Sequence, residues 1–139
     1  MTLYVKTITV ETSYNSETNT KSAEIEIRED VVFYIGVRFP PGPATKLKIA
    51  IFYGEEQIFP SSKGEWCSGD NEVLWDYIMW EAPEKPCKLR IKGYNTSTTY
   101  DHSAIIRIIA LPKWVLYGIK MLSRLAYFME ILAKYLIGV

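Results

Sequence analysis

Residues 31–39 read VVFYIGVRF, and this stretch decides the fold class. Apolar side chains occupy every second position from Val31 to Phe39, whereas Gly36 and Arg38 belong to the other set. Because side chains alternate between the two faces of a strand, this period of two predicts a strand with one face in a hydrophobic core. The next segment, PPGPATK at 40–46, has three prolines and a glycine and therefore predicts a turn.

The same alternation recurs on both sides of this strand, always between clusters of turn-forming residues. In the segment EVLWDYIMW it places Trp75 toward the interior. No helical pattern separates the alternating segments, so residues 1–111 are expected to form an antiparallel β-sandwich of about seven strands. The further segments that carry the pattern are 3–10, 23–29, 46–53, 57–60, 72–80, 87–94 and 104–110.

Residues 112–139 have a different character. Pro112 is suited to end the last strand and begin a helix, and no proline follows up to about Ile137. The expected helix of about 25 residues is a rod roughly 37 Å long. At 100° per residue its charged side chains form a polar stripe about 120° wide: Lys113, Lys120, Arg124, Glu130 and Lys134. The apolar remainder is led by Trp114, Ile119, Met121, Leu122, Leu125, Phe128, Met129, Leu132 and Leu136.

An apolar face this broad has to be covered from more than one direction. A simple bilayer span is disfavoured, since the longest run without a charge is six residues. Three arrangements would cover the face: a ring of helices whose polar stripe lines a lumen, a position in a membrane interface, or insertion into a groove of another protein. The alternative is packing across one sheet face of the same sandwich, with the basic side chains extending outward.

The charge balance limits the partners. Sixteen basic and sixteen acidic residues cancel, which argues against a nucleic-acid binder. From Lys113 onward the chain has four basic residues and one acidic residue, Glu130. That segment therefore carries a net charge of +3, and the rest of the chain carries −3. Basic residues beside apolar ones suit an anionic surface. The N-terminus shows no apolar core of a cleavable signal peptide.

No catalytic constellation, cofactor motif or metal-ligand spacing is present in the sequence, so we expect a protein that is not an enzyme. His102, the only histidine, lies beside Asp101 in a turn and is expected to be solvated. Cys67 and Cys87 do not have zinc-site spacing; a disulfide between them and two buried thiols remain open alternatives. Trp66, in the loop SSKGEWCSGDN, is the candidate contact for a glycan or protein, and a small-molecule ligand is not expected.

Residues 72–109 contain the pattern Trp80-x-Ala82-Pro83, a strand, Tyr100-Asp101-x-Ser103 and a closing strand. This pattern resembles the Ig-like repeat of the Ser/Thr-rich, membrane-anchored cell-wall protein family. The resemblance implies an Ig-like or fibronectin-III-like sandwich and an exterior location, and it transfers no active site. The family's Ser/Thr-rich stalk is absent from this sequence. The Ile- and Tyr-rich composition is also similar in style to structural proteins of viruses that infect thermophilic archaea.

These observations predict a non-enzymatic structural protein that assembles into a homo-oligomer through its C-terminal helix, as a tail, neck or envelope-associated component of a virion. A membrane or another structural protein is the further partner considered. The alternative is a surface adhesin, or glycan-binding sandwich, that the helix holds at a membrane. Both predict a location on a virion or cell envelope.

Overall fold

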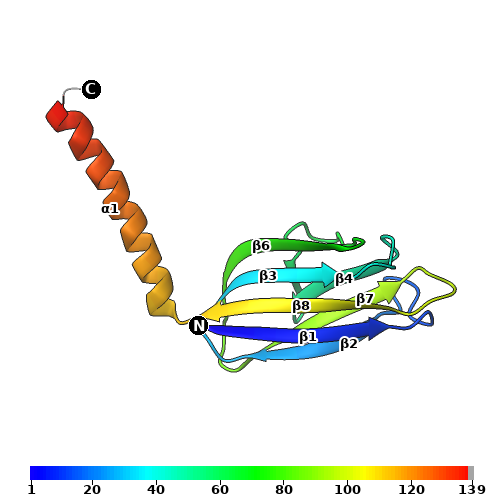
Figure 1. Cartoon of the computed structure of the whole chain (residues 1–139). Helices are drawn as coiled ribbons and strands as arrows, with labels where there is room; N and C mark the ends of the chain where they lie inside the picture. The colour runs from blue at the N-terminus through cyan, green and yellow to red at the C-terminus, as the bar shows by residue number, and fades with distance from the viewer. Residues whose placement is uncertain (138–139) are drawn as a thin grey trace.

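The computed structural model describes residues 1–137 and contains eight strands and one helix, α1 (Lys113–Ile137). Gly138 and Val139, the end of the predicted C-terminal segment 112–139, lie outside the described residues. Figure 1 shows an elongated body of strands from one end of which α1 projects. The strands are β1 (Thr2–Val10), β2 (Lys21–Ile27), β3 (Val31–Phe39), β4 (Leu47–Tyr53), β5 (Glu56–Phe59), β6 (Glu72–Glu81), β7 (Cys87–Asn95) and β8 (His102–Leu111).

The strands form two four-stranded antiparallel sheets, in the orders β1-β8-β3-β6 and β2-β7-β4-β5. Consecutive strands lie in opposite sheets, except that β4 and β5 pair as a hairpin. The predicted antiparallel sandwich with one C-terminal helix is therefore confirmed. Its strand order is that of a jelly roll, in which a long antiparallel ribbon wraps into two sheets. An Ig domain instead groups its first, second, fourth and fifth strands in one sheet, so the connectivity of this sandwich differs from that of an Ig domain.

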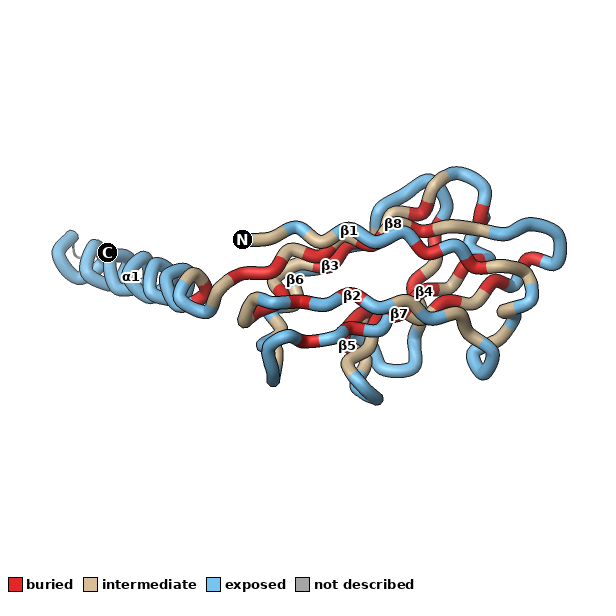
Figure 2. Tube along the Cα trace, turned by 90° about the horizontal axis from the view of Figure 1, so that it is seen from below, coloured by how far each residue is buried: buried red, intermediate tan, exposed pale blue. Residues whose placement is uncertain are grey.

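The hydrophobic core lies between the two sheets and contains no residue of α1. Ile35, Val37 and Phe39 of β3 are fully buried there, facing Ile49, Ile51 and Ile91 of the second sheet. Buried segments follow the sheets along the body, whereas α1 is exposed almost throughout (Figure 2). The sandwich therefore closes its own core, with β-branched side chains that suit a pleated surface.

One buried polar residue ties the loop 96–101 to the core. The Asn95 side-chain amide donates hydrogen bonds to the carbonyl oxygens of Val10 (3.1 Å) and Tyr100 (2.8 Å). Its side-chain oxygen accepts one from the Ser97 N–H at 2.9 Å. Because both the donors and the acceptor are used, the burial of this side chain costs little free energy.

The sequence assigned the wrong face to Trp75. On β6 the side chains of Leu74, Ile78 and Trp80 pack against the core, whereas Trp75 is 54% exposed on the outer face. Both sets of alternate residues on this strand are apolar, so the pattern does not distinguish inward from outward. A bulge between Val32 and Tyr34 also shifts the pairing of β3 with both neighbours. As a result Val32, rather than Phe33, belongs to the core cluster.

Candidate functional site

The junction between sandwich and helix is fixed at its first turn. The Lys113 N–H donates to Asp30 Oδ2 at 2.9 Å, so Asp30, from the loop between β2 and β3, caps the helix N-terminus. Lys85, from the loop between β6 and β7, forms an ion pair with the same carboxylate. The Lys85 ammonium, and then the Lys113 N–H, hold the pKa of the Asp30 carboxyl below its ordinary value. This stabilisation is therefore present above the ordinary pKa of about 4 and is lost as the pH falls through the lowered value.

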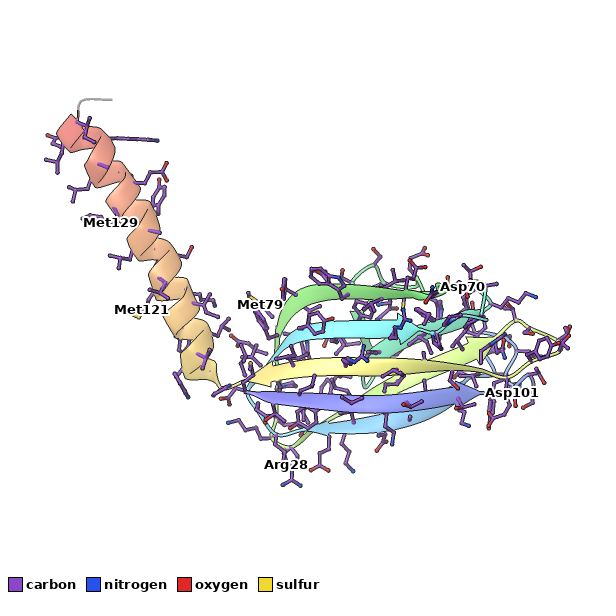
Figure 3. All side chains as sticks on the ribbon, viewed as in Figure 1. Arg28, Asp70, Met79, Asp101, Met121 and Met129 are labelled. Atoms are coloured by element: carbon purple, nitrogen blue, oxygen red, sulfur yellow. The ribbon has the colours of Figure 1, made fainter. Side chains whose placement is uncertain are left out.

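Beyond this first turn the sandwich gives α1 almost no cover. Leu116, which is 2% exposed, is the one buried side chain of the helix. Leu116 interrupts the polar stripe, so the helix rests on the body by its polar side and leaves its apolar side uncovered. Met121 and Met129 extend from α1 into open space, remote from both sheets (Figure 3). The helix does not pack across a sheet of its own chain, the alternative that the sequence had left open.

All nine apolar residues predicted for the interface are exposed, from 38% for Leu132 to 74% for Leu136. Some of them line an open apolar groove on α1. Gly118 lines this groove, and the space above it is open, since a Cβ there would meet nothing within 4 Å. The residues lining the groove are Gly118, Met121, Leu122, Arg124, Leu125 and Phe128. Gly118 is not among the residues predicted from the sequence, although a glycine among large side chains is a signal that identifies such a position.

The polar stripe contains one ion pair between its own residues. Lys134 Nζ lies 3.4 Å from Glu130 Oε1, as an i,i+4 ion pair, and both side chains are well exposed. Near the start of the helix, the ammonium groups of Lys113 and Lys120 lie 5.9 and 6.0 Å from the centroid of the Tyr117 ring. These weak contacts at exposed positions leave the stripe basic and hydrated.

A second apolar surface, on the outer face of the β1-β8-β3-β6 sheet, was missed by the sequence interpretation. Its centre is an aromatic cluster of Phe33, Tyr34, Trp75 and Tyr77, in which the Trp75 and Tyr77 ring centroids are 5.2 Å apart. The pairing of Tyr34 with Ile109, and of Ile109 with Leu3, extends the patch across to β1. Exposed contiguous apolar patches of this kind mark interaction surfaces.

The outer face of the other sheet is charged where β2 meets β7. Glu24 lies opposite Arg90, and Glu26 lies opposite Lys88, so opposite charges alternate across the two strands. The two sheets therefore present different surfaces to their surroundings, one aromatic and one ionic.

Trp66, the predicted ligand contact, lies half-buried beside β4. Its ring meets the Tyr94 ring edge-on, with centroids 4.9 Å apart, and lies 6.3 Å from that of Phe52. Lys92 Nζ lies 4.8 Å from the Phe52 centroid. An open pocket beside these rings is lined by Glu17, Phe52, Glu55, Glu56, Gln57, Lys63, Gly64 and Trp66. Aromatic faces next to polar side chains are suited to sugar stacking or to a protein contact.

The two cysteines are free thiols and not the disulfide that the sequence left open. Cys67 pairs with Ile49, which lies opposite Gly93, whereas Cys87 begins β7 six residues earlier. Six residues along a strand span roughly 20 Å, beyond the reach of a disulfide. Burial raises the pKa of the Cys67 thiol to about 12 and also raises that of Cys87. Both thiols are therefore protonated and unreactive at neutral pH.

The remaining sequence candidates do not converge. His102 begins β8 opposite Val10, and the Asp101 carboxylate accepts a hydrogen bond from the Thr12 N–H at 3.2 Å. Over residues 1–137, no three His, Cys, Asp or Glu side chains gather closely enough to hold a metal ion. No helix in the described part of the chain combines the length and the apolar character needed to cross a bilayer.

A scan against protein-family models gave no match, and a search of curated proteins gave none either. The role of these surfaces therefore has to be inferred from their own geometry and chemistry.

Proposed function

We propose that this chain is a non-enzymatic structural protein that assembles into a homo-oligomer by burying the apolar face of α1. The observation that carries the proposal is the isolation of the helix: of its 25 residues only Leu116 is buried. A helix exposed on its apolar side over this length is unstable in water unless another surface covers it.

The energetics favour association. A large apolar side chain contributes about 1.5–3 kcal/mol when fully buried. The nine predicted interface residues are about 40–75% exposed, so covering them contributes roughly 10 kcal/mol per helix. Association costs about 4–15 kcal/mol in lost translational and rotational freedom for each chain that joins the assembly. Helix burial is therefore of the size needed to offset this cost and drive assembly.

Two further features support a role within a larger assembly. The aromatic patch on the outer face of the β1-β8-β3-β6 sheet offers a contact surface separate from α1. The jelly-roll strand order is shared by viral capsid, lectin and cupin domains, which is an analogy of fold and not of site. From the analogy with viral capsid domains we infer a virion component, such as a tail, neck or envelope-associated protein, located at the exterior of a particle.

A charge placed on the apolar face tests this function. In Leu125→Asp an unpaired carboxylate would have to enter the helix contact at a cost of several kcal/mol. We expect the dissociation constant of the assembly to rise about 100-fold or more, measured by light scattering over a dilution series. The matched control, Tyr127→Asp, adds the same charge on the side of the polar stripe, seven residues from both Lys120 and Lys134, and should leave the mass unchanged. Equal loss of assembly in both variants would contradict the proposal.

The second candidate is a surface adhesin that binds a glycan through the Trp66 pocket. The observation that favours it is the juxtaposition of Trp66 and Phe52 with Glu17, Gln57 and Lys63 in one open pocket. If the chain is an assembly protein, Trp66→Ala should leave the mass of the assembly unchanged. In that case neither the unmodified chain nor Trp66→Ala should bind any oligosaccharide on an array. Oligosaccharide binding that is lost in Trp66→Ala and retained in Trp75→Ala, which removes an exposed ring from the other sheet, would favour the adhesin.

A further inference from the structure

The apolar face of α1 has a stricter period than amphipathic packing requires. Seven positions follow one another at alternating steps of three and four residues, and we call them the seam: Val115, Gly118, Leu122, Leu125, Met129, Leu132 and Leu136. These steps make three heptads with a mean period of 3.5 residues. A seam of this period keeps facing a second helix of the same kind as the two supercoil, with side chains of one entering holes of the other. The open groove around Gly118 provides such a hole.

The residues on the two flanks of the seam differ in size. One flank is large, with Trp114, Met121, Phe128 and Tyr135, and the other is smaller, with Ile119, Ala126 and Ala133. In a parallel bundle the first flank of one helix meets the second flank of its neighbour, five positions further along. Met121 then lies against Ala126 of the next copy, and Phe128 against Ala133. Large side chains facing small ones fill a helix interface well.

In an antiparallel arrangement the large flank of one helix lies against the large flank of its neighbour, and the smaller flank lies against the smaller flank. Phe128 and Met121 would then meet large residues of the neighbour, while Ala126 would meet alanine and leave space. Overpacking on one side and voids on the other both cost stability. The size pattern therefore favours parallel helices.

The width of the apolar surface sets the number of copies. A two-helix coiled coil buries mainly the seam, whereas here both flanks are apolar as well. Covering both flanks requires a neighbour on each side, hence three or more helices. The exposed apolar side chains of seam and flanks offer roughly 1,000 Å² per helix, above the roughly 800 Å² per partner of a standard interface.

The polar positions fit the outside of such a bundle. Lys113, Lys120, Tyr127 and Lys134 recur every seven residues on the side opposite the seam. Leu116, which interrupts the polar stripe, is already buried at the junction with the sandwich and would stay so. The basic stripe thus faces water and the sandwiches, and does not line the lumen of a ring.

We propose that α1 forms a parallel bundle of three or more copies of this chain, with the seam at the centre and the sandwiches gathered at the N-terminal end of the bundle. The inference rests on the proposed function and adds to it the orientation of the helices and the minimum number of copies.

Cysteine cross-linking in the full-length chain tests the orientation. In Leu132→Cys the new thiols lie side by side only in a parallel bundle, so mild oxidation should give a covalent dimer within the assembly. Tyr127→Cys, on the outer stripe, should cross-link at least tenfold more slowly. The native cysteines are buried, so the introduced thiol is the one that reacts.

A mixed assembly separates the two orientations. When a size-tagged Gly118→Cys chain is coexpressed with Leu132→Cys, a parallel bundle joins 118 to 118 and 132 to 132. Cross-links from 118 to 132 in an assembled protein would show antiparallel helices, which overturns the inference and leaves the proposed function intact. Faster cross-linking at 127 than at 132, or an assembly of only two chains, would also overturn it. A single subunit in solution would contradict both proposals.

Discussion

Removal of residues 113–139 is expected to leave a folded, soluble and monomeric sandwich. The core cluster contains no residue of α1, and its largest members are fully buried between the two sheets. Deleting the helix therefore removes the surface that drives assembly without opening the core. Light scattering should give the mass of one truncated chain, and thermal unfolding should stay cooperative.

A second truncation keeps the first turn of the helix. A chain that ends at Gly118 retains the Asp30 cap and the buried Leu116 and loses the seam from Leu122 onward. It should also be monomeric and at least as stable as the shorter chain. If both truncated chains are unfolded, α1 belongs to the cooperative unit of the sandwich and the proposed division of the molecule is wrong.

A substitution in the core should have a large effect that does not depend on the helix. Ile108 of β8 is fully buried between its neighbours β1 and β3. Ile108→Ala removes three carbon atoms and leaves a cavity, so the free energy of unfolding should fall by about 2–5 kcal/mol. Because α1 is remote from this site, denaturant unfolding of the full-length and 113–139-deleted chains should give the same loss within about 0.5 kcal/mol.

Ile105 provides the control on the same strand. It is half-buried on the outer face, where it lies opposite Thr7 and Arg38. Ile105→Ala should therefore cost about 1 kcal/mol or less. A loss for Ile108→Ala that is much larger in the full-length chain than in the truncated one would mean that the helix stabilises the sandwich directly.

The sequence predicted the elements of this fold well because their signals are local. Pro112 and the uninterrupted run of helix-forming residues predicted the helix that the structure places at Lys113–Ile137. The alternation in VVFYIGVRF predicted β3, and turn formers separated the other strands. These features depend on steric and packing preferences within a few residues of one another.

The strand order and the faces of β6 were not predictable in the same way. Pairing of β1 with β8 joins residues about a hundred positions apart, and no local pattern specifies it. On β6, Leu74 and Trp75 are equally suited to a core, so only the tertiary pairing decides which of them is exposed. The aromatic cluster on the outer face was missed for this reason.

The interface residues on α1 stay a prediction from the sequence, to which the structure adds their surroundings. The breadth of the apolar face was readable from the helical positions, as was the pairing of Glu130 with Lys134. The sandwich leaves this face uncovered because of the direction in which α1 departs. The Asp30 cap and the buried Leu116 help to set that direction. No periodicity within the helix contains that information.

The mass of the intact protein in solution tests the central claim most directly, because α1 presents more apolar surface than its own sandwich covers. Light scattering in aqueous buffer without detergent should give a mass of three or more chains, and detergent above its critical micelle concentration should lower that mass. A detergent-independent mass of one chain, with amide hydrogen exchange showing residues 119–137 protected, would mean that the helix folds onto its own sandwich and would contradict the account.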